Sequence, residues 1–425
     1  MNKGLLQQRT QTGLSTARSV SGAIGFLLLL VTVQAWAGTA TALLSEQEAV
    51  DLGLNRPEVI QQLESSIELA ESDLVEARTW KNPELSFEQE NISGLDNTTS
   101  RSYMLSQTLN LSGQMAMKTE AARQRLDAVT LETSQQRMER TADIKKTFYE
   151  VLYHQQLHDI FSEWRSAMDT MESVMDTRMK AGDISGYDLS RLKREQLFVQ
   201  AGQRQAHAEH DRLIHELLAI TGLPGDTSPL PGVSGSLLPE TLPLPLEQLL
   251  EQVTRQPDLM AIQLQNKAYA TDERLANRWW LSDLTLGAGV KDGDNGEGDA
   301  LLLQLSMPIP LFDRNSAALT RAKASQRHLQ NTYTLALSER EGKIRGLWNQ
   351  ASELAGTIQS LAADENCQAI VQTSELAYKA GEIGVLEIID AYRSSFENRA
   401  QILSLMRETR MVRIELDVIT GGNTQ

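Results

Sequence analysis

The sequence KAGDI at residues 180–184 recurs as KAGEI at residues 379–383, which is 199 positions further along the chain. In each copy the glycine follows a long polar and apolar stretch without proline, so the pattern predicts a tight turn after a long helix. Two such similar turns at this separation indicate that the chain contains the same helical hairpin twice.

Other landmarks recur with offsets of 199 or 200 residues. They are NRPE at 55–58 and RQPD at 255–258, Trp80 and Trp280, the LS pairs at 105–106 and 305–306, and ITG at 220–222 and 419–421. Between the copies, residues 223–246 hold six of the eleven prolines, which predicts an extended linker because proline fixes φ and removes a donor. We therefore expect a first repeat at 38–222 and a second at 247–425.

Each repeat is predicted to contain a helix, a β-hairpin, a long helix and a returning helix. The hairpins occupy residues 84–109 and 283–309, where apolar side chains alternate with small or polar ones, as in Leu301, Leu303 and Leu305. This alternation is typical of membrane-barrel strands, although a soluble hairpin packed on a helix would also show it. Polar, glycine-rich loops and tryptophans at the strand bases favour the barrel.

Four strands cannot close a membrane barrel, since the smallest known have about eight. Three copies would supply twelve strands, and the long helices at 114–179 and about 315–378 would form a tunnel beneath them. The predicted fold is an α+β membrane protein, mostly long α-helical hairpins forming a tunnel. Its four β-strands per protomer contribute to a 12-stranded trimeric β-barrel.

The first 37 residues resemble a secretory signal peptide. Lys3, Arg9 and Arg18 precede an apolar run at 23–33, and a small-x-small site ends at Ala37. Cleavage after Ala42 is the alternative, and the run is short for a membrane anchor, which needs about twenty apolar residues. The protein is therefore predicted to be exported.

The charge of the chain limits its partners. The net charge is −16 and becomes about −19 once the leader's three positive charges are removed, which disfavours nucleic acid and favours cations. Cys367 is the single cysteine, so neither an internal disulfide nor an N-terminal lipid anchor is expected. No phosphate loop, nucleophile elbow or zinc-protease motif occurs, so we predict no enzyme activity, no cofactor and no metal site.

The second turn continues as GEIGVLEIIDA at residues 381–391, and the second hairpin ends in SMPIPLFDRN at 306–315. With the NRPE helix start and the paired hairpins, these motifs resemble the TolC-like outer-membrane factor family over essentially the whole mature chain. The SMPIPLFDRN segment resembles the heavy-metal, CzcC-like branch in particular. The resemblance implies a passive trimeric duct in the outer membrane of a Gram-negative bacterium, with the helical tunnel in the periplasm.

The resemblance also implies partners and a working site. The partners are a periplasmic adaptor protein, an inner-membrane pump of the resistance-nodulation-division (RND) type and outer-membrane lipid. The two turns would form a gate at the periplasmic entrance, and the matching positions are Gly182, Asp188, Arg191, Gly381, Glu387 and Asp390. Arg191 departs from the pattern because it stands where the second copy has Asp390, and we hypothesise that it pairs with an acidic residue of the turns to hold the entrance shut.

Alternatives remain at each level. Charged residues at helix starts are often only solvated and offset the helix dipole. A duct for drugs or for type I protein secretion is the nearest alternative function, and a periplasmic adaptor or coiled-coil scaffold is one from another class. The histidine pairs 154/158 and 207/210 have metal-ligand spacing but no obvious third ligand, so solvated helix histidines are favoured. The methionine stripe at 168, 171, 175 and 179 is interpreted as helix packing.

Overall fold

The computed structural model describes residues 43–92, 98–110, 113–226, 230–239, 244–278, 280, 283–293, 299–362 and 366–421. Contacts divide the chain into residues 1–40 and 41–425, and everything described belongs to the second unit. The predicted signal peptide and both candidate cleavage sites lie outside the described residues.

The first half begins with a short strand and helix and continues with a helix, a β-hairpin, a long helix and a returning helix. Its elements are β1 (Leu44–Ser45), α1 (Glu46–Leu54), α2 (Pro57–Arg78), β2 (Glu84–Ile92), β3 (Thr98–Leu109), α3 (Gln114–Ala181) and α4 (Gly186–Thr221). Pro57 stands in the first turn of α2, where its missing N–H costs no helical bond. At about 1.5 Å per residue, the 68 residues of α3 extend over about 100 Å.

The second half repeats this order after a short strand and helix. Its elements are β4 (Val233–Ser234), α5 (Leu246–Val253), α6 (Pro257–Ala276), β5 (Leu284–Gly293), β6 (Ala300–Ser306), α7 (Ser316–Ala362), α8 (Asn366–Ala380) and α9 (Val385–Thr420). Pro257 opens α6 as Pro57 opens α2. The second long helix is thus described as α7 and α8, with residues 363–365 between them outside the described part.

The four long strands form one antiparallel sheet in the order β2-β3-β5-β6. Its register aligns Leu85 with Leu105, Leu105 with Ala288, and Ala288 with Leu303. This row lies on the exposed face, where Leu85 and Leu303 are 77% and 79% exposed. A continuous apolar face of this size is unusual on a surface in contact with water.

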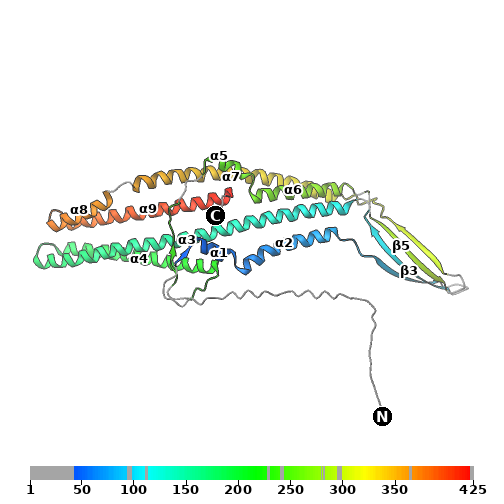
Figure 1. Ribbon diagram of the computed structural model, residues 1–425, viewed down its shortest axis with the longest axis horizontal. Coiled ribbons are helices and arrows are strands. Elements are labelled where there is room, and N and C mark those ends of the chain that lie inside the picture. Colours follow the sequence, from blue (N-terminus) through cyan, green and yellow to red (C-terminus); the bar gives the residue numbers. More distant parts are fainter. Residues whose placement is uncertain are drawn as a thin grey trace, which may run out of the picture. The chain divides into compact units, whose positions relative to one another are not determined.

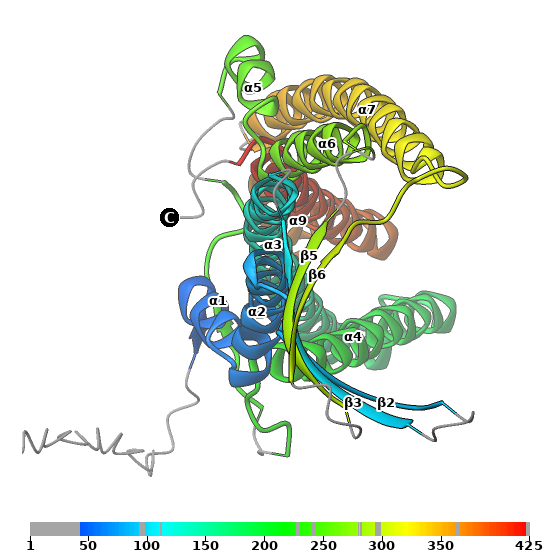
Figure 2. The same cartoon turned by 90° about the vertical axis from the view of Figure 1, so that its right-hand side faces the viewer.

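The opposite face of the sheet carries mostly small and polar side chains, with Met104 and Leu302 as apolar exceptions. Glu84 aligns with Ser106, Ser106 with Gly287, and Gly287 with Gln304. The alternation predicted from the sequence is therefore confirmed in all four strands. Figure 2 shows the strands as a twisted ribbon that continues from the ends of the helices.

The helices follow the same lateral order as the strands. Among the described residues α2 packs on α3, α3 on α6, and α6 on α7, while α3 also contacts α4 and α9. Figure 1 shows α2, α3 and α6 running side by side toward the strands, with α4 alongside the far part of α3. Strands and helices thus form one wall whose edges are α2 with β2 and α7 with β6.

Three buried clusters hold this wall together. The first joins α1, α3, α4 and the linker through residues such as Phe148, Leu217 and Val233, and the third joins α5, α6, α7 and α9 around Ile344. The second lies near the two turns, between the α3–α4 and α8–α9 hairpins. Each fully buried large apolar side chain stabilises the fold by about 1.5–3 kcal/mol compared with the same side chain exposed to water.

The predicted linker is not wholly without secondary structure. Its Val233 belongs to β4, which pairs in parallel with β1, and Leu44 donates its N–H to the Gly232 carbonyl at 2.9 Å. The Gln155 amide accepts from the Val233 N–H and donates to its carbonyl, both at 3.1 Å. These two hydrogen bonds to the backbone hold the linker against α3.

The last strand is shorter than its alternation suggests. β6 ends at Ser306, although apolar residues continue on the same face at Met307 and Ile309. Pro308 and Pro310 lack the N–H groups that a strand would need there. No helix in the described part of the chain is both long and apolar enough to cross a membrane.

Gly289 is the position at which strand pairing leaves least room. A β-carbon there would lie 2.3 Å from the Tyr103 carbonyl oxygen on β3. Gly289→Ala should therefore disrupt the β3–β5 pairing that unites the two hairpins, and should reduce the amount of oligomer that gels of outer membranes run without heating detect. Gly346→Ala is the matched control, since nothing lies within 4 Å of its β-carbon. Equal oligomer in both variants would contradict this role of Gly289.

Candidate functional site

The two turns predicted from KAGDI and KAGEI have the same backbone structure. Gly182 and Gly381 are left-handed, with φ of 85° and 81°. The Gly182 N–H donates to the Met179 carbonyl at 3.0 Å, and the Gly381 N–H donates to the Tyr378 carbonyl at 3.1 Å. Glycine accepts this conformation without strain, and the turn satisfies carbonyls at the end of each long helix.

Asp188 helps to cap the start of α4. Ser185 donates its N–H and its hydroxyl to the Asp188 carboxylate, at 3.2 and 2.7 Å, and its Oγ accepts from the Asp188 N–H at 3.2 Å. This is a capping box, which satisfies two N-terminal amides and favours the helix by about 0.5–2 kcal/mol. The Asp188 carboxylate therefore has a structural role within its own chain.

Glu387 occupies the matching position at the start of α9, but its surroundings differ. The N-cap residue is Gly384, which has no side chain to form a box. A β-carbon on Gly384 would lie 2.9 Å from the Glu387 Oε2, so the carboxylate folds back over the helix start. Glu387 itself is exposed.

Arg191 and Asp390 are both exposed, one turn further along their helices. The Arg191 guanidinium lies over the Tyr187 ring, 5.9 Å from its centroid. The ion pairs between described residues of one chain include none between Arg191 and Asp390. Their pairing stays a prediction for neighbouring copies.

The two hairpins are joined near the turns by contacts that the repeat pattern did not predict. Arg178 on α3 donates to the Tyr378 and Lys379 carbonyls at the end of α8, at 3.0 and 3.2 Å. Its guanidinium also lies over the Tyr378 ring at 4.6 Å. This side chain ties the end of one long helix to the end of the other.

A second contact joins the returning helices. Arg393 on α9 donates to both carboxylate oxygens of Glu195 on α4, through Nε at 3.2 Å and through Nη2. The Glu195 side chain is 9% exposed, whereas that of Arg393 is 44% exposed. A buried carboxylate with a bidentate arginine holds a defined geometry. We name this pair the Glu195–Arg393 clamp.

The methionine stripe packs between the hairpins, as predicted for its first three members. Met168, Met171 and Met175 are buried in the cluster near the turns, and Met179 is 37% exposed. Trp164 and Phe161 of α3 both contact the Phe396 ring of α9, with ring centroids 4.4 and 4.6 Å apart. These apolar contacts accompany the polar clamp.

Tyr392 fixes α9 against α8. Its hydroxyl donates to the Glu375 carboxylate. Burial, together with the hydrogen bond to Glu375, raises the pKa of Tyr392 well above its usual range. The phenol therefore keeps its proton and remains a donor at physiological pH.

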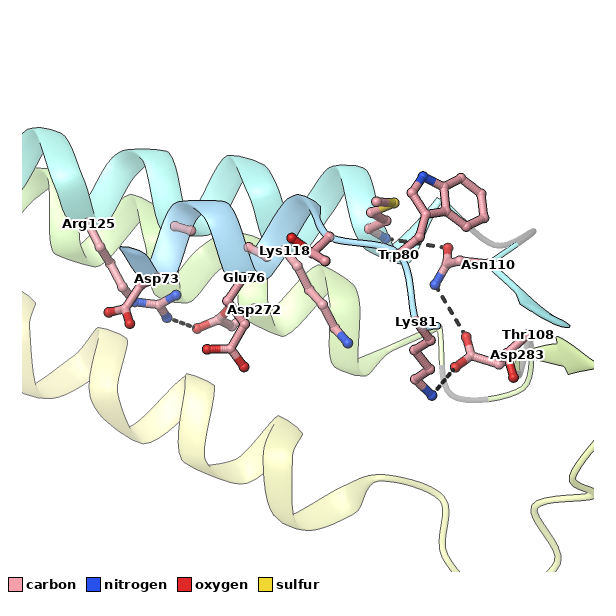
Figure 3. Close-up of a pocket in the computed structure, with 14 residues that line it drawn as sticks. Asp73, Glu76, Trp80, Lys81, Thr108, Asn110, Lys118, Arg125, Asp272 and Asp283 are labelled. Carbon is pink, nitrogen blue, oxygen red and sulfur yellow. Dashed lines mark hydrogen bonds and ion pairs between the residues drawn. The ribbon is translucent and has the colours of Figure 1, made fainter. Parts of the chain in front are cut away.

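A polar pocket of about 710 Å³ lies at the other end of the wall, where helices meet strands (Figure 3). Lys81 pairs with Asp283 at 3.1 Å, and Asn110 donates to the same carboxylate at 3.3 Å. Arg125 of α3 pairs with Asp272 of α6. These pairs connect the strand bases of both repeats, so the pocket is a structural junction.

Residues 249–422 match the family model described as "Outer membrane efflux protein". Over this second half, the chain resembles the outer membrane efflux protein family. It is 23% identical over 367 residues to the cobalt-zinc-cadmium resistance protein CzcC of Cupriavidus metallidurans, covering 84% of each chain. It is 22% identical over 291 residues to the nickel-cobalt-cadmium resistance protein NccC of Alcaligenes xylosoxydans xylosoxydans, covering 66% of this chain and 65% of the relative.

Solved structures of efflux channels share the fold. A CusC structure matches with a TM-score of 0.74 at 16% identity, over 89% of this chain and 92% of that one. The MtrE outer membrane channel of Neisseria gonorrhoeae matches with a TM-score of 0.71 at 17% identity, over 89% of each chain. The predicted fold class is confirmed by these structures, and the predicted family resemblance and outer-membrane location agree with the match of residues 249–422.

The Glu195–Arg393 clamp makes a testable prediction about closure. Glu195→Gln removes the charge from a buried pair, and hydrogen bonds to charged groups are worth about 1.5–3 kcal/mol. We expect the open fraction in single-channel recordings to rise roughly tenfold, and Arg191→Glu to raise it as well if that residue pairs across copies.

Glu163→Gln is the matched control for the clamp. It removes the same charge from an inter-hairpin pair with Arg399, but both side chains are exposed, and such pairs contribute little. An open fraction that rises equally in both variants, or in neither, would exclude the clamp as a closing contact.

Proposed function

We propose that this chain is the outer-membrane duct of a tripartite efflux system and assembles as a homotrimer. It receives solute from an RND-type pump through a periplasmic adaptor and conducts it passively to the exterior. The observation that carries the proposal is the four-stranded sheet, whose exposed apolar face and two free edges are incomplete in a single chain.

Ring closure by identical copies explains both edges of the wall. The edge strands β2 and β6 present unpaired backbone groups, which are costly in lipid. Exposed apolar side chains also lie along the edge helices, such as Leu69 on α2 and Leu335 on α7. Pairing β2 of one copy with β6 of the next is head-to-tail, and three copies would give the twelve strands of a barrel.

Divalent heavy-metal cations are the proposed cargo. Two relatives are named for resistance to cobalt, cadmium and either zinc or nickel. Exposed Glu387 and Asp390 at the second turn would be repeated three times around the entrance, and acidic rings favour cations. The names of the relatives and the acidic residues at the second turn support this cargo. The pump would still make much of the selection among solutes.

A duct for drugs or secreted proteins remains the alternative within the family. The same wall and turns would serve it, so the distinction must come from transport. The other alternative, a periplasmic adaptor or scaffold, has no support once the family is known.

The cargo can be tested in cells that carry the cognate pump and adaptor. Cells without this chain should accumulate several-fold more zinc, cobalt or cadmium, measured by elemental mass spectrometry, because the exit is missing. Reintroducing the chain should restore the low metal content of the cells, whereas introducing the Gly289→Ala variant should not. Unchanged metal content with increased sensitivity to organic drugs would instead favour the drug duct.

A further inference from the structure

Four of the six histidines gather where α3 and α4 pack against each other, away from the turns. His158 of α3 and His207 of α4 have ring centroids 5.7 Å apart. His210 on α4 lies within electrostatic reach of His154 on α3. His207 lies 25 residues beyond Gly182, which corresponds to roughly 35 Å along the helix.

Three side chains on α4 converge within this group. His207, His210 and Asp211 place one potential ligand atom each within 4.8 Å of one another. The Asp211 Oδ1 lies 3.5 Å from the Nδ1 of His207 and 3.5 Å from the Nδ1 of His210. In a tetrahedral zinc site with bonds of about 2.1 Å, ligand atoms lie about 3.4 Å apart, so two edges of the tetrahedron are already present.

These distances fit a shared metal ion better than direct ion pairs. A charged N–H to carboxylate hydrogen bond is usually about 2.7–2.9 Å long, which is shorter than either contact. The ion pairs among the described residues give Asp211 no lysine or arginine partner. Its neighbour Arg212 is instead bound by Glu209 and Glu216 at 2.9 and 3.1 Å.

The state of the histidine rings also suits a ligand role. The Nε2 of His210 is buried and has no hydrogen-bond partner among the described residues, so no hydrogen bond at that nitrogen competes with ligation through Nδ1.

We propose that His207, His210 and Asp211 bind a divalent transition-metal ion of the zinc class, with His158 from α3 as the fourth ligand. Two imidazoles and a carboxylate suit Zn²⁺, Co²⁺ and Ni²⁺. His158 is 36% exposed and lies on the other helix, so its ligation would cross-link α3 to α4. His207 is 64% exposed, so the ion exchanges with the surrounding solution.

The site is independent of the cargo that the duct conducts. It would replace the sequence-based prediction of no metal site. That prediction found no third ligand for the histidine pairs because it did not consider Asp211. Failure of metal export in cells would leave this proposal intact, and failure of metal binding by the purified protein would leave the duct intact.

The test uses the tag-free mature protein, purified in detergent as its natural assembly and freed of metal. Competition with a chromophoric chelator should give one Zn²⁺ per chain, and Co²⁺ should give the visible absorption of a tetrahedral site. His207→Ala, His210→Ala and Asp211→Asn should each weaken Zn²⁺ binding by roughly a hundredfold or more, since even outer-shell groups cost about 10–100-fold. His328→Ala, at an exposed histidine of α7, is the matched control and should bind as the parent does.

His158→Ala tests the fourth ligand separately. A weaker site and an altered Co²⁺ spectrum are expected, and unchanged binding would exclude ligation from α3. The whole proposal is overturned if the parent binds no Zn²⁺, or if the three α4 variants bind it with the parent's affinity and stoichiometry. Circular dichroism and oligomer mass of each variant confirm that the comparison is made on folded protein.

Discussion

Unpaired backbone groups along β2 and β6 are the constraint on which the rest of the structure depends. In lipid each unsatisfied group costs several kcal/mol, so a sheet with free edges cannot remain there as a single chain. The order of the helices repeats the order of the strands, so closing the sheet also brings α2 toward α7 of a neighbour. The contacts between copies that close the barrel thus also close the helical tunnel.

The duplication supplies the repeated framework, and the differences between the copies supply its contacts. Both turns use the same left-handed glycine. Ser185 with Asp188 forms a capping box in the first copy, whereas Gly384 leaves Glu387 uncapped in the second. The two turns are therefore alike in backbone but differ in capping, and Arg191 in place of an acidic residue makes the copies unequal in charge at the proposed entrance.

The sequence allowed the strand faces, the turns and the two halves to be predicted, because each is a local pattern with a fixed period or offset. It did not predict the Glu195–Arg393 clamp, since the pair is not repeated: Arg194 matches Arg393, but Ser394 stands at the position that matches Glu195. β4 was missed because its pairing with β1 is non-local. Asp211 was overlooked although it directly follows His210 and lies one helical turn from His207.

The most direct test of ring closure is an electron cryomicroscopy structure of the mature protein extracted from the outer membrane. The account predicts three copies around one axis, with β2 of each hydrogen-bonded to β6 of the next and the apolar strand face in contact with detergent or lipid. A single copy with free edges, a different number of copies, or a sheet whose apolar face is covered by the chain's own helices would contradict it.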